Sequence, residues 1–513
     1  KHPGFAGSAK QALDAYCELY GLVPPVSTLD NPLLKNPLLL KLSCESAASE
    51  NSKSLEVLGR HAIFETSIKT KTKKINDSLS LSPSDNRVGE AISLVADRIF
   101  ESGGDSALLA EIEPAVNELL PNRDEYPRTL FRKMVEFGIL EVSYKPGKVE
   151  TVRFLFQAVS DHLLATRLLE RMFGRQLESI DPKLVEHPDL WPAAALILAE
   201  RYDTELSEVI SADVNPNWFH RGVADSLMQR STSTFTDRAR VLLEEGLQDT
   251  KWRDLYVNCA CALSYREGHP ANSVWLTECL FSMEMSDRDS FWGVATYFIA
   301  DASDEFNNVV SLLSEGRGET GEKEQRFLAV QFLVWLLASP NRFLRDRISK
   351  LVANLWRRDR EMNLRVLAGF HGVNDPYIVE RLLTCTYGAL LGQTEPDPTD
   401  VLIVDYVSEC YRPDAICDVL ARDSLRGIIR WSRAYPELFD RDVKDFEPPY
   451  GLDFPNEPLS VAEIKSKYGK HEGDDGTTSR RAESILMSAL PNFGDFAVKI
   501  VRGDVNSFRI EGQ

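Results

Sequence analysis

Apolar residues recur every three or four positions through most of the chain, which is the spacing of amphipathic α-helices. Between residues 9 and 20, Ala12, Leu13, Tyr16, Cys17 and Tyr20 fall on one helical face. The same spacing predicts helices over 62–79, 88–100, 106–120, 127–137 and 161–172. Farther along, it predicts helices over 192–202, 224–228, 238–247, 252–264, 273–283, 325–337, 344–356, 361–370 and 376–391.

At one place the period changes to the alternation of a β-strand. Residues 139–144 and 149–156 alternate in this way, and Lys145-Pro146-Gly147-Lys148 between them has the Pro-Gly pair of a turn. Three helices followed by a β-hairpin are typical of a winged helix. Successive helix pairs of about 35–50 residues are typical of an α-solenoid.

These patterns predict a mainly α chain in four parts. We expect a small helical domain over 1–85, a winged helix with one β-hairpin over 86–175, and an α-solenoid of HEAT- or TPR-like helix pairs over 176–445. An acidic, Pro-rich loop and a further helical segment would occupy 446–513. The polar run 80–86 marks the first boundary.

Charge and composition limit the binding partners and the cellular compartment that we expect. The 59 Lys and Arg residues against 78 Asp and Glu residues give a net charge of −19, which repels nucleic acids and anionic membranes at long range. No apolar run is long enough for a transmembrane helix, and no signal peptide is recognisable. The 8 cysteines include no CxxC pair, so we expect buried free thiols and a cytoplasmic protein.

Motifs for catalysis and metal binding are weak. Gly316-Arg-Gly318-Glu-Thr-Gly321 matches GxGxxG, but helices are predicted on both sides, which favours a helix–helix loop. The histidines show no HxxxH or HExxH spacing, and Cys259-x-Cys261 has no further ligands nearby. Without a GxxxxGK[ST] motif, we expect no enzyme in this chain alone, no catalytic residues and no metal ligands.

Several residue sets have plain structural interpretations. Ser160 or Asp161 would cap the helix that carries His162. We interpret the lysines at 69, 71, 73 and 74 as a solvated helix face, and the 8 tryptophans mainly as core, with a minority as partner anchors.

The order of several motifs resembles the antiviral STAND NTPases, the Avs or AVAST phage-defence family related to NACHT and NB-ARC proteins. The resemblance rests on the opening His2-Pro3-Gly4-Phe5, on Asn36-Pro37-Leu38, and on Val152-Arg153-Phe154 with Ser160-Asp161-His162. In the solenoid it rests on Arg345-Asp346, Asp375-Pro376-Tyr377, Arg422-Asp423-Ser424 and Gly494-Asp495-Phe496. It implies that the chain begins after a P-loop ATPase core, as part of a longer protein.

The resemblance also implies roles for three residues. Pro37 would lie against the base of a bound nucleotide, although it also suits the first position of a helix. The phosphate-sensing histidine of related winged helices aligns with Phe156, so Arg153 and His162 are the nearest substitutes. Cofactors are implied only for the parent, as ATP or ADP with Mg²⁺.

The partners implied are a phage structural or packaging protein of the terminase or portal class, bound by the solenoid, and the chain's own P-loop domain. Binding would release an autoinhibited ATPase that assembles as a homo-oligomer, a tetramer, and activates an N-terminal effector. Two alternatives stay open: a non-enzymatic helical scaffold or adaptor, and a STAND-type transcription regulator that uses its winged helix.

Overall fold

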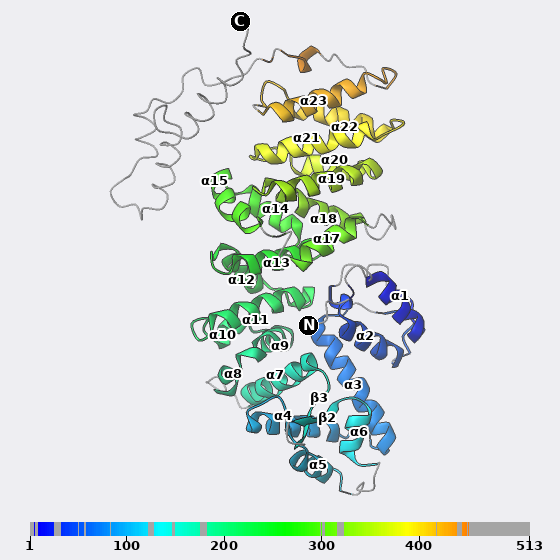
Figure 1. The fold of residues 1–513 in the computed structure, drawn as a ribbon, viewed down its shortest axis with the longest axis vertical. Helices are drawn as coiled ribbons and strands as arrows, with labels where there is room; N and C mark the ends of the chain where they lie inside the picture. Colours follow the sequence, from blue (N-terminus) through cyan, green and yellow to red (C-terminus); the bar gives the residue numbers. More distant parts are fainter. Residues whose placement is uncertain are drawn as a thin grey trace, which may run out of the picture. The chain divides into compact units, whose positions relative to one another are not determined.

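A computed structural model gives the fold of the 513-residue chain (Figure 1). It describes Phe5 and residues 9–450, apart from 25–31, 50, 56–57, 83, 122–127, 146–148, 175–181, 298, 300–302, 315–322, 417, 439–443 and 449. The chain divides into two compact units, residues 1–411 with 418–446, and residues 412–417 with 447–513. All the described helices and strands belong to the first unit. The predicted helical segment after 446 and the GxGxxG stretch lie outside the described residues.

The described part of the chain is mainly helical, with one small antiparallel sheet, as the sequence predicted at that level. Among its helices, none combines the length and hydropathy that a bilayer crossing requires. The finer divisions into a winged helix and a solenoid stay predictions.

The first helices pack through two small apolar clusters. These helices are α1 (Ala9–Tyr20), the short 3₁₀ helix η2 (Pro32–Lys35), α2 (Pro37–Ser49) and α3 (Arg60–Leu79). One cluster is shared by α1 and α2 and the other by α2 and α3. Leu13 and Cys17 of α1 pack in one buried cluster with Leu40 and Cys44 of α2. These ranges confirm the predicted helices at 9–20 and 62–79.

A three-stranded sheet follows, with two helices between its first two strands. The elements are α4 (Arg87–Ser102), β1 (Ala107–Leu108), α5 (Leu109–Glu118), α6 (Leu130–Glu136), β2 (Leu140–Lys145) and β3 (Val149–Phe154). The strand order is β1-β3-β2, with all neighbours antiparallel. Val152 at the centre lies opposite Val142 on β2 and Ala107 on β1, so the middle strand is held from both sides.

Strand β1 corrects the sequence prediction. The pattern placed a helix over 106–120 and a lone hairpin at 139–156, but 107–108 form a strand and α5 starts at Leu109. Two residues are too few to show alternation, so only pairing with β3 makes them a strand. The predicted second strand is also too long, since β3 ends at Phe154.

The remainder of the described unit is a succession of helices. After α7 (Gln157–Gly174) come α8 (Pro182–Glu186), η3 (Pro188–Leu190), α9 (Trp191–Tyr202), α10 (Leu206–Val209), α11 (Pro216–Gln229), η4 (Thr232–Thr234), α12 (Asp237–Gln248), α13 (Arg253–Ser264), α14 (Ser273–Phe281), α15 (Met285–Arg288), the π-helix η5 (Asp289–Gly293), α17 (Asp304–Ser314), α18 (Lys323–Trp335), η6 (Leu336–Ala338), α19 (Arg342–Arg358), α20 (Arg360–Gly369), α21 (Pro376–Leu391), α22 (Pro398–Cys410), α23 (Val419–Ser432) and η7 (Lys444–Phe446).

Side-chain caps explain where many of these helices begin. Asn215 accepts a hydrogen bond from the backbone N–H of Trp218, and Asp375 accepts from those of Tyr377 and Ile378. Asp397 caps α22 in the same way. A proline follows each of these caps, at the first helical position, where its missing N–H costs nothing.

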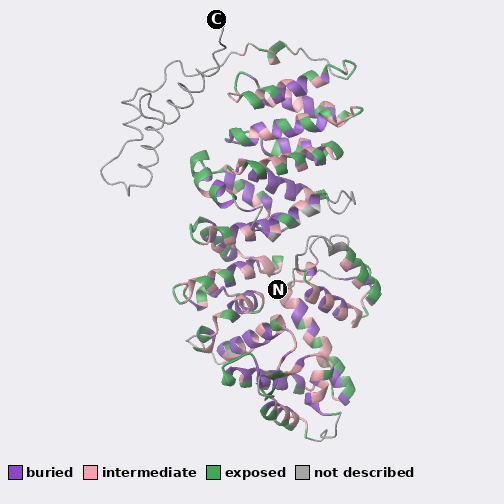
Figure 2. Ribbon diagram, viewed as in Figure 1, coloured by how far each residue is buried: buried purple, intermediate pink, exposed green. Residues whose placement is uncertain are grey.

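Three helices near the end of the unit lie side by side and run in the same direction. Arg381 of α21 contacts Asp346 of α19 at 3.3 Å, and farther along Gly388 lies opposite Ala353. Thr384 of α21 hydrogen-bonds Ser424 of α23 at 2.9 Å. In Figure 2, buried stretches (purple) alternate with exposed ones (green) along these helices. The three contacts follow the same order along the helices, so the starts of α19, α21 and α23 are neighbours.

Candidate functional site

Pro37 stands at the first position of α2, as its sequence context predicted. The Asn36 Oδ1 atom accepts hydrogen bonds from the backbone N–H groups of Leu38 and Leu39, at 2.9 and 3.3 Å. Leu38 and Leu39 pack in one cluster with Phe64 of α3 and Val159 of α7. The helix-start role of Pro37 is confirmed, and its contact with a nucleotide base stays a prediction.

Arg153 lies on β3 and is engaged across the hairpin. Its Nε and Nη2 atoms are each 2.9 Å from Glu141 Oε2, and the two residues are direct partners in the β2–β3 register. A phosphate that bound Arg153 would therefore have to compete with a carboxylate already in place.

His162 is almost fully buried, with 2% of its surface exposed. Its Nε2 atom is 2.9 Å from Glu65 Oε1 on α3, and its ring lies 5.1 Å from that of His61 and 5.2 Å from that of Phe64. The prediction that Ser160 or Asp161 caps this helix is wrong. Helix α7 already begins at Gln157, because β3 ends at Phe154 and the chain turns directly into the helix.

The three predicted site residues thus contact different partners. The group that the structure brings together around His162 consists of His61 and Glu65, one helical turn apart on α3. Sequence reasoning missed this group, because His162 follows Glu65 by 97 residues. The available signal was the four-residue spacing of His61 and Glu65, which places both side chains on one helical face. Two imidazoles and a carboxylate are a donor set that binds metals.

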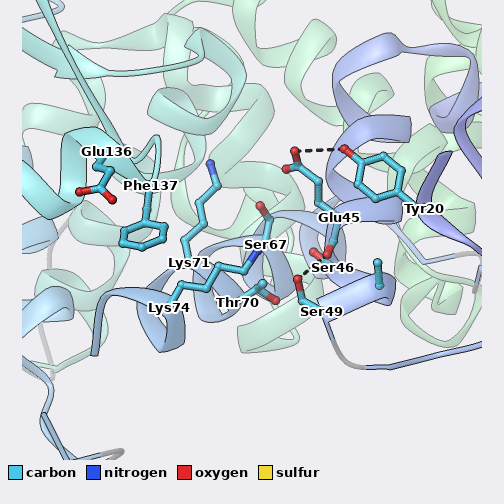
Figure 3. A pocket seen from close by; sticks show the side chains of 11 residues that line it. Tyr20, Glu45, Ser46, Ser49, Ser67, Thr70, Lys71, Lys74, Glu136 and Phe137 are labelled. Carbon is cyan, nitrogen blue, oxygen red and sulfur yellow. Dashed lines mark hydrogen bonds between the residues drawn. The ribbon is translucent and has the colours of Figure 1, made fainter. Parts of the chain in front are cut away.

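A pocket of about 450 Å³, lined by polar and apolar groups, lies between the first helices and the end of α6. Figure 3 shows Tyr20 and Glu45 on one side of it, Glu136 and Phe137 on the other, and lysines of α3 between them. The Tyr20 hydroxyl donates to Glu45 at 3.3 Å, and burial together with this carboxylate raises the pKa of Tyr20 to about 12. Tyr20 is therefore a neutral donor at physiological pH.

Lys71 in this pocket departs from the predicted solvated face. Lys69, Lys73 and Lys74 are exposed, but Lys71 is half-buried and its Nζ atom donates to the Gly138 carbonyl oxygen at 2.7 Å. Burial lowers the pKa of Lys71. The side chain links α3 to the turn after α6, which is a structural role. The pocket lining balances Lys71 and Lys74 against two glutamates, which gives it no strong preference for an anion.

Exposed apolar side chains gather where α19, α21 and α23 begin. Phe343 is 87% exposed, Tyr377 is 56% exposed, and Val419 and Leu420 are 68% and 59% exposed. Since the three helices run parallel, these residues lie at the same end of neighbouring helices, and we call this set of four the apolar ridge. The Arg345 guanidinium lies 5.3 Å from the centre of the Tyr377 ring. An apolar ridge with a cation–π contact beside it is typical of a surface that binds protein.

We compared the chain with protein-family models, with curated proteins and with solved structures, and none matches it.

Proposed function

We propose that the chain is the switch and sensor region of a STAND-type antiviral defence ATPase. In this proposal the helices from α9 onward form an α-solenoid that binds a phage protein of the terminase or portal class. Binding would relieve autoinhibition of a parent protein that carries a P-loop domain and binds ATP or ADP with Mg²⁺. The parent would then assemble as a homo-oligomer and activate its effector. A ligand can drive such a change only through its preference for the open state.

The apolar ridge is the observation that carries the proposal. Phe343, Tyr377, Val419 and Leu420 are exposed on neighbouring helices rather than scattered over the surface. Burying one such side chain in an interface contributes about 1.5–3 kcal/mol. Because the ridge lies on three packed helices, a partner that binds there meets a largely rigid surface.

The order of elements from α4 to β3 supports a winged helix in this proposal. One helix, a short strand, two helices and a hairpin follow one another, and the short strand pairs with the last strand, which is the order expected of a winged helix. Basic side chains of α6 are already paired with acids. Arg132 lies 3.4 Å from Glu113, and Lys133 lies 2.6 Å from Glu136. Together with the net charge of −19, these pairs favour a protein contact over DNA binding, and so favour a switch over a transcription regulator.

A helical scaffold without an ATPase is the second candidate, because the ridge would serve an adaptor equally well. The two candidates differ in what precedes the chain. A GxxxxGK[ST] motif after a predicted strand in the upstream coding sequence is expected for the ATPase switch. An open reading frame that starts immediately before Lys1 would favour the scaffold.

The sensor function is tested by co-purification with phage large terminase subunits and portal proteins. We expect the tagged chain to retain one of these classes, and the double substitution Phe343→Ser, Tyr377→Ser to weaken binding at least about tenfold. Leu19→Ser on α1 is the matched control, since Leu19 is 76% exposed but lies far along the chain from the ridge. Failure to retain either class, or equal binding by the ridge variant, would overturn the sensor proposal.

A further inference from the structure

Three side chains of kinds that can bind a metal converge between α3 and α7. His61 and Glu65 are four residues apart on α3, and His162 comes from α7. One ligand atom from each, a ring nitrogen or a carboxylate oxygen, lies within 4.8 Å of the other two. A single ion bonded to all three at about 2.0–2.2 Å would hold such atoms roughly 3–4 Å apart, so small side-chain shifts complete the geometry.

The hydrogen bonding of this cluster is incomplete. The His162 Nε2 atom is 2.9 Å from Glu65 Oε1, so these two side chains satisfy each other. The Nδ1 atom of His61 is buried and has no hydrogen-bond partner within the described part of the chain. Leaving a buried ring nitrogen without a partner costs free energy. A cation bound through this nitrogen would remove that cost.

Charges of both signs lie near the cluster. Glu200 and Arg201 on α9 add one of each, and the Arg201 guanidinium is paired with Glu170 at 3.0 Å. The nearest cation therefore already has a carboxylate partner.

We infer that His61, Glu65 and His162 bind a divalent cation of the zinc class. Two imidazoles and one carboxylate are a common protein ligand set for Zn²⁺, and are poor ligands for Ca²⁺ or Mg²⁺, which prefer oxygen. The side chain of Glu65 is 48% exposed, so water reaches the cluster from its side and supplies the fourth ligand. This inference is independent of the proposed sensor function.

The expected role of the ion is to fasten α3 to α7. The two helices belong to different predicted segments, one before and one after the three-stranded sheet. Their direct packing already includes the Phe64–His162 ring contact. A metal bridge would hold the register of α3 against α7 far more strongly than one hydrogen bond between His162 and Glu65 does.

Zinc binding to the whole chain tests the inference. After removal of metal with a chelator and dialysis, we expect one equivalent of Zn²⁺ to bind, measured by calorimetry and elemental analysis, and the melting temperature to rise. Co²⁺ in place of Zn²⁺ is expected to give the visible absorption of a site with nitrogen ligands. His61→Gln and Glu65→Gln should each weaken zinc binding at least about tenfold, since each removes a direct ligand.

His371→Gln is the matched control, because His371 is exposed and lies outside the cluster. We expect it to bind zinc as the unmodified chain does. Circular dichroism on each variant establishes that the helices are intact, so a loss of binding is not a loss of fold. The inference is overturned if the unmodified chain retains less than a tenth of an equivalent, or if the cluster variants bind zinc as tightly as the control. In either case His162 and Glu65 form a structural hydrogen bond and no more.

Discussion

Two buried arginines form polar contacts inside the helical core. Arg230 is 2% exposed and forms a two-pronged contact with Glu205, through Nη1 to Oε1 at 2.7 Å and Nη2 to Oε2 at 2.9 Å. Arg288 is fully buried and reaches Asn374 at 2.7 Å and Asp375 at 3.3 Å. Such pairs are costly to break, because the partner left behind is a buried, unpaired charge.

The Arg230–Glu205 pair gives the first prediction. Arg230→Met keeps most of the side chain's volume but leaves the buried Glu205 carboxylate without its ion-pair partner. We therefore expect the free energy of unfolding to fall by about 3–5 kcal/mol. Arg238→Met is the control, since Arg238 is about half exposed, at 47%, where it contacts Asp203 and Glu208. It should cost less than about 1 kcal/mol. Urea titration measures both, and equal losses would show that burial does not set the strength of the Arg230 pair.

His269 gives a prediction about acid. It is 2% exposed, its Nδ1 accepts from the Ala271 N–H at 3.1 Å, and burial, with Arg266 and Arg230 nearby, lowers its pKa to about 3. The unfolded chain has the ordinary value near 6.5. Between these values only the unfolded state binds the proton, so this contribution is complete above about pH 6.5 and shrinks as the pH falls toward 3.

Lowering the pH should therefore reduce the unfolding free energy of the unmodified chain more than that of a variant that cannot titrate at position 269. Between pH 7.5 and pH 5.5 the unmodified chain should lose about 1 kcal/mol more unfolding free energy than His269→Asn, which keeps an acceptor for the Ala271 N–H but cannot titrate. The exposed residue His371 provides the control, and His371→Asn should follow the unmodified chain. If His269→Asn loses as much stability as the unmodified chain, His269 is not held neutral in the fold.

At the scale of helices and strands, the sequence pattern succeeds where an element is long and amphipathic. The helix predicted at 9–20 matches α1, and the one predicted at 344–356 lies within α19. It fails where tertiary contact decides. Strand β1 exists through its pairing with β3, and α22 and α23 were not predicted although Asp397 and Asp418 cap them. Residues 160–162 were read as a helix start because the pattern does not reveal how closely α7 follows β3.

Close packing between α12 and α13 gives a prediction at this scale. A methyl group at Gly246 on α12 would overlap the ring of Tyr256 on α13. Tyr256 is 2% exposed and its hydroxyl is 3.0 Å from His220 Nδ1, so the ring has little room to move. We expect Gly246→Ala to lower the unfolding free energy by about 1–3 kcal/mol.

A second glycine provides the control for this packing effect. A methyl group at Gly369, the last residue of α20, would meet no atom within 4 Å. Gly369→Ala should therefore leave stability unchanged or raise it by up to about 1 kcal/mol, since alanine is the better helix former. Thermal and urea unfolding of the two variants measure the difference. Similar effects of the two substitutions would mean that α12 and α13 are not packed this closely.

At the scale of the whole described unit, composition and periodicity predict the class of fold but not which helices meet. The mainly helical character could be read from the sequence. The eight tryptophans divide into Trp191, Trp292, Trp335 and Trp356, which are fully buried, and four that are half-buried, a division that spacing alone does not give. The contact of α3 with the helices beyond the sheet could not be predicted from the sequence either. Arg60 donates to Gln229 Oε1 at 2.6 Å, although the two residues are 169 positions apart in the sequence. No local pattern predicts a contact between residues so far apart in the chain.

This contact, which we call the α3 seam, gives the last prediction. A methyl group built at Gly59 would lie 3.6 Å from the Gln229 carbonyl oxygen, so the backbone itself comes close here. A hydrogen bond to a charged group contributes about 1.5–3 kcal/mol. We therefore expect the double variant Arg60→Ala, Gln229→Ala to raise amide hydrogen exchange about tenfold in the first turn of α3 and the last turn of α11. Exchange in α19–α23 should not change, because those helices are held by their own contacts.

Arg365→Ala is the control, since the Arg365–Glu324 pair at 2.6 Å joins α20 to α18, and faster exchange in this variant should be confined to those two helices. A rise spread evenly over every helix, or none at α3, would mean that the seam does not hold the first helices to the rest of the unit.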